Sequence, residues 1–298
     1  MKATKAHWPT VVIVGVGLIG GSIGLALKAR KRAGRVIGVG RSPASLAEAK
    51  RLHAIDEAST DLTAAVAVAD LVVVATGVAS IPGILDQVDA AARPGTLVTD
   101  AGSTKARIVA AWEKGRSLRG TRKGGSSSRG RQARFVGAHP VAGSHRRGPA
   151  AADPQLFQGR VTVVTPAAAT PPADVEAITD FWSALGSNVA TMTPRDHDRI
   201  LAMTSHAPHV VAAAVAAATP AEARPFTAGG WRDTTRIAAG DPELWADILL
   251  DNAPAVARAL SRIAGVTEKI LDALESNDRR RLVSLLMRAK EDRDALGS

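Results

Sequence analysis

The chain has 298 residues, 46% of them hydrophobic, and it carries a formal net charge of +10 with no cysteine. This length and apolar content allow two ordinary domains, each with its own core, and argue against intrinsic disorder. The lack of cysteine excludes disulfides, thiolate metal ligands and cysteine nucleophiles, so acids and bases must be oxygen or nitrogen groups. We see no apolar run of membrane-spanning length and no secretory leader, and we expect a cytoplasmic protein without membrane contact.

A glycine-rich turn follows the first predicted strand. Four apolar β-formers at residues 11–14 precede Gly15, Gly17 and Gly20, and a segment suited to a helix follows. This order of strand, turn and helix is the context in which the G-x-G-x-x-G pattern binds a dinucleotide. Gly15 permits the tight turn, Gly17 lets the pyrophosphate approach, and Gly20 lets the helix pack on the strand. The alternative is a glycine-rich turn in another kind of α/β protein. The predicted cofactor-binding residues of this turn are Gly15, Gly17, Leu18, Ile19 and Gly20.

The residues after the second predicted strand bear on the choice of cofactor. A site that prefers NAD usually has Asp or Glu there, which binds the ribose hydroxyls. This chain instead has Arg41 and Ser42 shortly after the strand at 36–39. A guanidinium and a hydroxyl can bind the 2′-phosphate of NADP. We therefore predict that Arg41 and Ser42 belong to the cofactor site and that NADP is preferred. NAD is the alternative, because an arginine can also stack on adenine.

Strand-like apolar runs recur through the first half of the chain, at residues 11–14, 36–39, 71–75, 96–99, 135–138 and 161–164. This alternation predicts the α/β class, with a mostly parallel, Rossmann-type sheet covered by helices on both faces. After Pro166 the pattern changes to alanine-rich helical stretches, with one short possible strand at 189–192. We predict a dinucleotide-binding domain over residues 1–166 and an all-α substrate and dimerisation domain over 167–298. The segment 212–218 is apolar on every side, which predicts burial against another helix or a second subunit.

Much of the positive charge lies in one low-complexity segment, residues 114–134. This segment has almost nothing to bury and contains no aromatic side chain that would stack on a base. We interpret it as a flexible basic insertion on the surface, and we expect no nucleic-acid partner. The competing interpretation is a basic loop that contacts nucleic acid.

Two polar turns follow neighbouring strands of the predicted sheet. Ser103 lies in the turn Asp100-Ala-Gly-Ser-Thr-Lys105, and His139 comes directly after the strand at 135–138. Ligands of open α/β sheets bind at the carboxyl ends of the strands, so we expect Ser103 and His139 together above the cofactor. An imidazole at that place can take a proton. The alternatives are that Ser103 only caps a helix and that His139 is a structural histidine.

Further polar residues lie in the helical half. His206 and His209 begin the alanine-rich helix, and two histidines without a carboxylate or thiolate are a poor ligand set, so we predict no metal. His206 can hydrogen-bond a polar substrate, whereas His209 can be a core histidine. Arg236 follows the glycine pair that includes Gly230, and its planar fork suits a carboxylate.

Taken together, these motifs resemble the prephenate and arogenate dehydrogenase family of tyrosine biosynthesis over nearly the whole chain. The shared motifs, in the order of that family, are the glycine fingerprint, Asp100-Ala-Gly-Ser-Thr-Lys105, His139-Pro-Val-Ala-Gly-Ser144, Ser205-His-Ala-Pro-His209 and Gly229-Gly-Trp-Arg-Asp-Thr-Thr-Arg236. The resemblance implies a nucleotide-binding domain, a helical dimerisation domain and a homodimer. It also implies oxidative decarboxylation with hydride transfer to NAD(P)+, which converts prephenate to 4-hydroxyphenylpyruvate or arogenate to tyrosine.

The resemblance also implies roles for individual residues. His139 would be the base that takes the proton of the ring 4-hydroxyl, Ser103 would hold that hydroxyl, and Arg236 would pair with a substrate carboxylate. The residues implied to line the substrate pocket are Ser144, His145, His206 and Gly230. Many relatives have Glu where this chain has His145, and other relatives also have His, so a gating or ionic role of that carboxylate is not assigned to this chain.

Two other interpretations compete with this one. The first is another two-domain NAD(P)-dependent hydroxyacid dehydrogenase, such as a 3-hydroxyacid dehydrogenase, which would have a catalytic lysine where this chain has His206 and His209. The second is a non-catalytic nicotinamide-binding protein that uses the basic segment for partners. Intact His139, Ser103 and Arg236 argue against the second interpretation.

Overall fold

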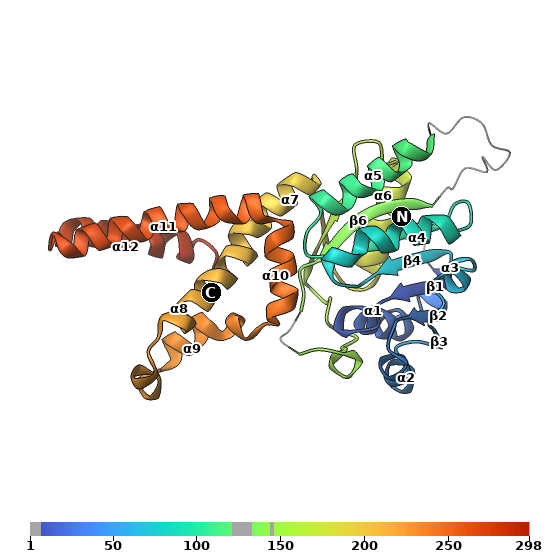
Figure 1. Cartoon of the computed structure of the whole chain (residues 1–298), viewed down its shortest axis with the longest axis horizontal. Coiled ribbons are helices and arrows are strands. Elements are labelled where there is room, and N and C mark those ends of the chain that lie inside the picture. Colours follow the sequence, from blue (N-terminus) through green and yellow to red (C-terminus); the bar gives the residue numbers. More distant parts are fainter. Residues whose placement is uncertain (1–6, 121–132, 144–145, 298) are drawn as a thin grey trace.

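A computed structural model describes residues 7–120, 133–143 and 146–297 of the chain. It contains an α/β sheet domain and a helical domain that lie side by side, with the long helices of the second domain pointing away from the sheet (Figure 1). The site residues Ser144 and His145 and residues 121–132 of the predicted basic insertion lie outside the described residues. Residues 114–120, the first part of that predicted insertion, are helical, because helix α5 (Ala106–Gly120) includes them.

The sheet has eight strands in the order β3-β2-β1-β4-β5-β6-β7-β8. Every neighbouring pair is parallel except β6 and β7. The predicted Rossmann-type sheet is therefore confirmed, and each predicted strand is present, including the short one, which is β8. We did not predict β3, because its three residues, Glu-Ala-Ser, form no apolar run. The strands are β1 (Trp8–Val14), β2 (Ala33–Val39), β3 (Glu57–Ser59), β4 (Leu71–Val74), β5 (Leu97–Asp100), β6 (Arg134–Pro140), β7 (Val161–Thr165) and β8 (Asn188–Thr191).

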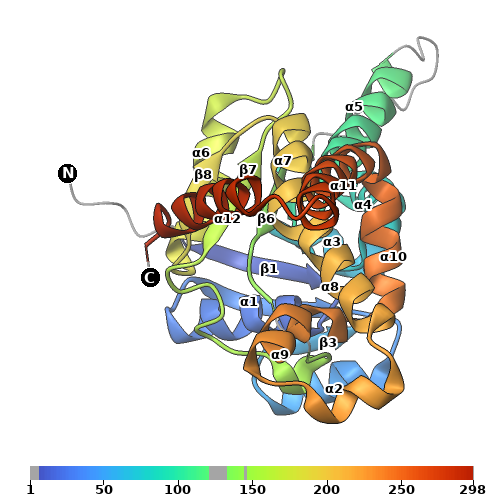
Figure 2. The same cartoon turned by 90° about the vertical axis from the view of Figure 1, so that its left-hand side faces the viewer.

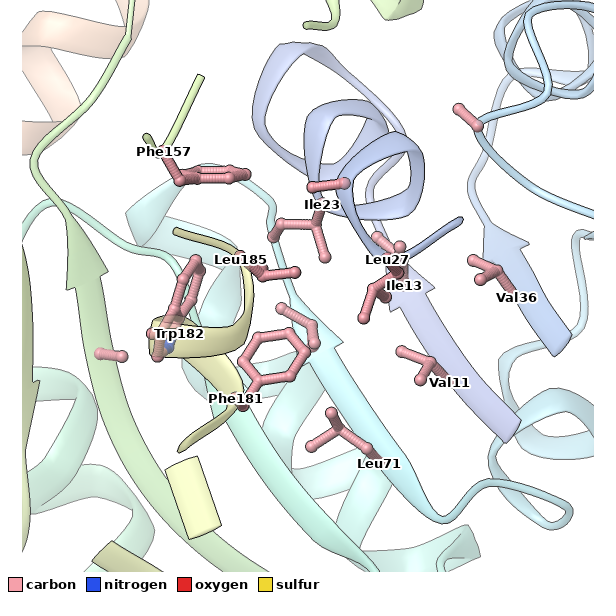
Figure 3. Close-up of a cluster of buried hydrophobic side chains, with 14 of the residues drawn as sticks. Val11, Ile13, Ile23, Leu27, Val36, Leu71, Phe157, Phe181, Trp182 and Leu185 are labelled. Atoms are coloured by element: carbon pink, nitrogen blue, oxygen red, sulfur yellow. The ribbon is translucent and has the colours of Figure 1, made fainter. Parts of the chain in front are cut away.

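Both faces of the sheet are covered, which explains why its central strands are apolar without alternation. Val11 and Ile13 of β1 point to one face, where they pack with Ile23 of helix α1, as the close-up in Figure 3 shows. Val12 and Val14 point to the other face. The helices and helical turns of this domain are α1 (Leu18–Ala29), α2 (Pro43–Arg51), α3 (Leu62–Val66), η1 (Val78–Ser80), α4 (Ile81–Ala91), α5, η2 (Pro149–Ala151) and α6 (Pro172–Ala184).

The sheet domain continues past residue 166, where we had placed its end. Helix α6 buries Phe181 and Trp182 completely in the same cluster as Val11, as Figure 3 shows. Strand β8 then pairs with β7 in parallel register. The large aromatic side chains of α6 need the sheet face to leave water, which an alanine-rich helical domain does not offer. Helix α6 and strand β8 therefore pack with the sheet, before helix α7 begins at Pro194.

The helical domain has a small core of its own, and most of its surface is open. Its buried apolar cluster consists of Ala202, Ala207, Val256 and Ala259. Helices α11 and α12 extend from the sheet domain as a pair (Figures 1 and 2). In the segment 212–218, which we predicted to be buried, only Ala212 is buried within one chain. The elements are α7 (Pro194–Leu201), the π-helical turn η3 (Ala202–His206), α8 (Ala207–Ala218), η4 (Ala221–Phe226), α9 (Gly229–Thr235), η5 (Arg236–Ala239), α10 (Pro242–Asp251), α11 (Ala253–Glu275) and α12 (Arg279–Asp294).

One continuous helix in the described residues is longer than we expected from the sequence. Elements α7, η3 and α8 join into a 25-residue helix, 194–218, whose most apolar 18-residue window has a mean hydropathy of 1.4, enough by length and composition alone to cross a membrane, as the core helix of a soluble protein also can be. Pro208 lies inside this continuous helix, directly after the π-helical turn η3, and irregular turns of that kind accommodate a residue that lacks the backbone N–H. The helix begins with the charged residues of α7 and packs on α5 and α11.

Candidate active site

The glycine turn between β1 and α1 has a separate steric reason for each glycine. Gly15 has φ +95°, and a Cβ there would lie 2.7 Å from the carbonyl oxygen of Ala75. A Cβ on Gly20 would lie 1.9 Å from the carbonyl oxygen of Gly15, so only glycine lets α1 approach the turn this closely. A Cβ on Gly17 would meet no atom within 4 Å. This open side faces outward from the start of α1, whose N-cap Gly17 has no side chain to bind the first amides.

This arrangement fits a dinucleotide. The free amides at the start of α1, with Leu18 and Ile19 in its first turn, are the donors that a pyrophosphate requires. Arg41 is exposed beyond the end of β2, and the described residues offer it no hydrogen bond or ion pair. The hydroxyl oxygen of Ser42 accepts a hydrogen bond from the amide of Ser45 at 3.2 Å and so caps α2. Its own proton can still be donated to a ligand.

A buried ion pair lies beneath the next turn of the same sheet edge. Lys105 and Asp100 are completely buried and pair with each other. The Lys105 ammonium also donates to the carbonyl oxygen of Ala138 at 2.8 Å, and Asp100 accepts from the amide of Ala138 at 3.1 Å. Burial lowers the pKa of Lys105, and the nearby carboxylates, Asp100 foremost, oppose that shift. Lys105 and Asp100 therefore bind the backbone carbonyl oxygen and the backbone amide of Ala138, the residue that precedes His139.

His139 lies at the end of β6 and is almost buried, with 8% of its surface exposed. Its Nδ1 lies 2.8 Å from Nε2 of His197 in α7, and the two rings meet edge to face. Nδ1 of His197 in turn lies 2.7 Å from a carboxylate oxygen of Asp198. The amides of Lys105 and Ala106 donate to the two oxygens of Asp198, each at 2.8 Å, so this carboxylate caps α5. Residues of three distant segments thus form one hydrogen-bonded chain.

The electrostatic surroundings keep His139 neutral. Burial lowers the pKa of His139 well below its ordinary value of 6.5, and the positive charges available on His197, Lys105 and His206 lower it further. Burial also lowers the pKa of His197, although the hydrogen bond to Asp198 opposes this. Within the described part of the chain, the second nitrogen of His139, Nε2, has no hydrogen-bond partner. A neutral imidazole with one unpaired nitrogen can accept a proton from a ligand at this edge.

Ser103 lies in the turn between Asp100 and Lys105 and is half-buried. Strands β5 and β6 are neighbours in parallel register, so the turn that carries Ser103 and the end of β6 that carries His139 lie at the same edge of the sheet. Among the described residues, the Ser103 hydroxyl makes no capping hydrogen bond. The carboxylate of Asp198 caps α5 in its place.

His206 is buried at the end of the π-helical turn η3, with 1% of its surface exposed. Its Nδ1 lies 3.2 Å from the side-chain amide of Asn252, which also donates to the carbonyl oxygen of Asp198 at 2.8 Å. Burial is the main cause that lowers the pKa of His206 to about 4. Asn252 thus connects His206 to the segment that carries His197. Irregular π-helical turns are frequent at functional sites.

His209 stacks on the indole of Trp245, with ring centroids 3.5 Å apart. Its Nδ1 is buried and has no hydrogen-bond partner in the described residues, so His209 is not a satisfied core histidine. A Cβ on Gly240 would come within 3.0 Å of the His209 ring, which places the end of η5 against the same pair.

Gly230 and Arg236 come from α9 and η5 and are exposed. Turn η5 packs on α8, the helix that carries His209. No hydrogen bond or ion pair joins Arg236 to His139 or to another residue in the ranges that the structure describes. The hydrogen bonds and ion pairs of the described residues therefore do not connect the exposed Arg236 to the cluster of His139 and His206.

Sequence reasoning missed several members of this cluster. The residues are His197, Asp198, Trp245 and Asn252. The stretch Asp196-His-Asp198 held a weak signal, because it places a histidine between two carboxylates. Nothing local pointed to Asn252 or Trp245, whose importance comes from contacts far along the chain. The described residues contain no group of three side chains that could hold a metal ion.

Comparison with known proteins identifies what the chain is similar to. The family described as "Prephenate dehydrogenase, nucleotide-binding domain" matches residues 23–191, and the family described as "Prephenate dehydrogenase, dimerization domain" matches residues 193–288. The two matches meet where β8 ends and α7 begins.

Individual relatives match over most of their length. The chain is 33% identical over 295 residues to "Prephenate dehydrogenase" of Bacillus subtilis (strain 168), which covers 96% of this chain and 76% of that protein. It is 31% identical to "Cyclohexadienyl dehydrogenase" of Zymomonas mobilis, covering 90% and 89%. The crystal structure of prephenate dehydrogenase from A. aeolicus in complex with hydroxyphenyl propionate and NAD+ superposes with a TM-score of 0.85 at 28% identity, covering 97% and 98%.

Proposed function

The chain belongs to the prephenate dehydrogenase family, and we propose that His139 is the base of its reaction. The reaction is the oxidative decarboxylation of prephenate or arogenate with hydride transfer to NAD(P)+, in tyrosine biosynthesis. One observation carries the proposal for His139. Its imidazole is buried and neutral at the carboxyl edge of the sheet, with Nδ1 held by His197 and Nε2 unpaired in the described residues.

The steps assigned to the protein are binding, orientation and transfer of one proton. The dinucleotide supplies the acceptor for the hydride that leaves ring carbon 4. Nε2 of His139 takes the proton of the 4-hydroxyl as the bond between ring carbon 4 and its hydrogen breaks. Ser103 holds the hydroxyl in line with the imidazole. Carbon dioxide then leaves carbon 1, the bonding electrons restore the aromatic ring, and the imidazolium returns its proton to the phenolate oxygen. Atoms and charge balance without a further acid.

The substrate carboxylate is assigned to Arg236. Its guanidinium has no partner in the described residues, and η5 packs on α8, the helix that carries His209. A free fork suits an anionic substrate. The other residues that we place around the substrate are Ser144, His145, His206 and Gly230.

NADP is the preferred cofactor in this proposal. No carboxylate follows β2, and Arg41, which is exposed and has no hydrogen-bond or ion-pair partner among the described residues, lies where the ribose of a bound dinucleotide is expected. Ser42 supplies a second donor. NAD remains able to bind, because the glycine turn contacts the pyrophosphate that both cofactors share.

A homodimer through the helical domain accounts for the exposed apolar side chains there. Leu271 and Leu274 of α11 are 51% and 57% exposed, and Leu286 of α12 is 54% exposed. The matched family description also names this region a dimerization domain. We further propose a cytoplasmic protein that acts without metal, membrane or nucleic acid.

Replacing His139 by Asn tests the base. Asparagine keeps a polar group of similar size but cannot take the proton, so turnover falls by roughly the 10²–10⁴ typical of a lost acid-base group. The affinity for NAD(P)+ stays unchanged, because the glycine turn is intact. Steady-state kinetics with prephenate and with arogenate provide the measurement, and near-normal turnover would remove His139 from the mechanism.

Replacing Arg236 by Gln tests the carboxylate partner. The Michaelis constant for the substrate rises. The corresponding loss of binding free energy is on the order of the 2–5 kcal/mol seen when one member of a buried charge pair is truncated. Lysine restores only part of the loss, because it keeps the charge without the planar fork. A surface arginine would give a small, salt-sensitive change instead. Kinetics at two salt concentrations distinguish the two cases.

A further inference from the structure

We propose that His197 is a positioning residue that sets the tautomer of His139, as the middle member of a chain that runs from Asp198 through His197 to His139. This inference rests on the proposed role of His139 as the base. It assigns a task to two residues, His197 and Asp198, that the proposed reaction does not itself use.

The direction of each hydrogen bond follows from valence. A carboxylate can only accept, so Nδ1 of His197 must carry a proton and donate it to Asp198 across 2.7 Å. A neutral His197 then has a lone pair on Nε2 and can only accept there. Nδ1 of His139, 2.8 Å away, must therefore be the donor. With its proton on Nδ1, neutral His139 has its lone pair on Nε2, the atom that takes the substrate proton.

The position of Asp198 fixes the directions of these hydrogen bonds. Its two oxygens accept from the amides of Lys105 and Ala106, which are backbone groups fixed at the start of α5. The side chain cannot rotate away without breaking both bonds. His197 is completely buried, so no water replaces either of its partners. Each ring nitrogen of His197 thus has one fixed partner with one possible role.

The same chain compensates the charge that forms on His139. The charged and titratable groups around this imidazole are Lys105 with Asp100, His197 with Asp198, and His206. Lys105 is already paired with Asp100. When Nε2 of His139 takes a proton, the positive ring remains bonded through His197 to the Asp198 carboxylate. The loss of that bond would leave a buried imidazolium beside Lys105 without compensation.

Two carboxamide variants of His197 separate positioning from mere packing. Glutamine places its amide oxygen near the place of Nε2, where it can accept from His139. Asparagine, one methylene shorter, places its amide near the place of Nδ1, where it can donate to Asp198 but does not reach His139. If His197 acts through His139, His197→Gln keeps turnover within about 5-fold of wild type, whereas His197→Asn loses roughly 10²-fold.

Two readouts respond to positioning and not to packing. The Michaelis constants stay near the wild-type values in both variants. The acid limb of the kcat profile moves to lower pH in His197→Asn, because the protonated His139 has lost its acceptor, and stays in place in His197→Gln. Nitrogen-15 NMR of histidine-labelled protein without substrate shows His139 protonated on Nδ1 in the wild type and in His197→Gln, and a mixture of tautomers in His197→Asn.

Three results would overturn the inference. They are equal turnover of the two variants, rescue by asparagine rather than glutamine, and an unchanged His139 tautomer in His197→Asn. Rescue by asparagine would mean that His197 serves only to hold Asp198. Failure of the proposed function is distinguishable from these results, because it requires near-normal turnover of His139→Asn, while the NMR measurement tests the tautomer whether or not His139 is the base.

Discussion

The glycine turn and the histidine cluster lie at the same edge of one sheet, yet the sequence builds them in different ways. The turn is contiguous, and the reasons for its glycines are steric contacts with nearby backbone, such as the approach of Gly20 to Gly15. The cluster is assembled from β6, α7 and the start of α5, and its bond between Lys105 and Asp198 joins residues 93 positions apart. One site is local, and the other exists only when the two domains are docked.

This difference predicts which properties of the protein a substitution in each site changes. A change in the turn affects the cofactor and the packing of α1 on β1. A change in the cluster affects turnover, the contact between the domains and stability together, because Asp198 of the helical domain caps a helix of the sheet domain. Asp251 at the end of α10 adds a second such contact, since it accepts from Thr104 and Arg107, each at 2.6 Å.

The largest expected effect comes from breaking the buried ion pair of the cluster. Lys105→Met leaves the Asp100 carboxylate buried without its cation, and the loss of one partner of a buried pair costs about 3–5 kcal/mol of unfolding free energy. Turnover falls as well, because the carbonyl oxygen of Ala138 loses its donor. Urea denaturation measures the first effect, and steady-state kinetics of the folded fraction measure the second.

The double variant Asp100→Asn with Lys105→Met is the matched control. It removes both charges and keeps an oxygen that accepts from the amide of Ala138, so part of the lost stability returns. If the double variant is no more stable than Lys105→Met, the loss comes from packing and not from the unpaired carboxylate.

A pair of alanine variants tests the local character of the turn. Gly20→Ala forces α1 away from the carbonyl oxygen of Gly15 and costs about 1–3 kcal/mol of stability, as overpacking does. Gly17→Ala meets no atom of the protein, so its stability stays within about 0.5 kcal/mol of wild type. Both variants bind NAD(P)+ more weakly. Equal stability of the two would contradict the steric account.

The local features were predictable from the sequence. The apolar runs around 11–14 and 71–75 predicted buried parallel strands, because both faces of the sheet are covered. The roles of Gly15 and Gly20 follow from spacing alone, since few other arrangements need glycine at those positions. His139 was singled out because a strand delivers it to the edge where ligands bind.

The remaining features depend on contacts between distant segments, which periodicity does not encode. Helix α6 was assigned to the helical domain, because nothing in its sequence says that Phe181 and Trp182 pack on the sheet. His197 was overlooked, because its function comes from His139, 58 residues earlier in the chain. The burial expected for 212–218 is incomplete in one chain, because a single sequence does not show which surface a second copy covers.

The smallest expected effect on stability concerns Arg41, which is exposed and makes no hydrogen bond or ion pair in the described part of the protein. Arg41→Asp weakens NADP far more than NAD, because only NADP places a 2′-phosphate beside the new carboxylate. A charge-assisted hydrogen bond contributes about 1.5–3 kcal/mol, so the ratio of the two dissociation constants changes by roughly 10- to 150-fold.

Lys50→Asp provides the matched control for that change, since it alters the charge equally on the exposed surface of α2. A long-range electrostatic effect would lower NADP affinity in both variants and would fade with salt. A specific contact lowers it in Arg41→Asp alone and persists at moderate salt. Stability stays near the wild-type value in either case, because neither side chain is buried. Equal loss of NAD and NADP in Arg41→Asp would show that Arg41 binds a part common to both cofactors, such as adenine, and would leave the preference of the site without a residue to explain it.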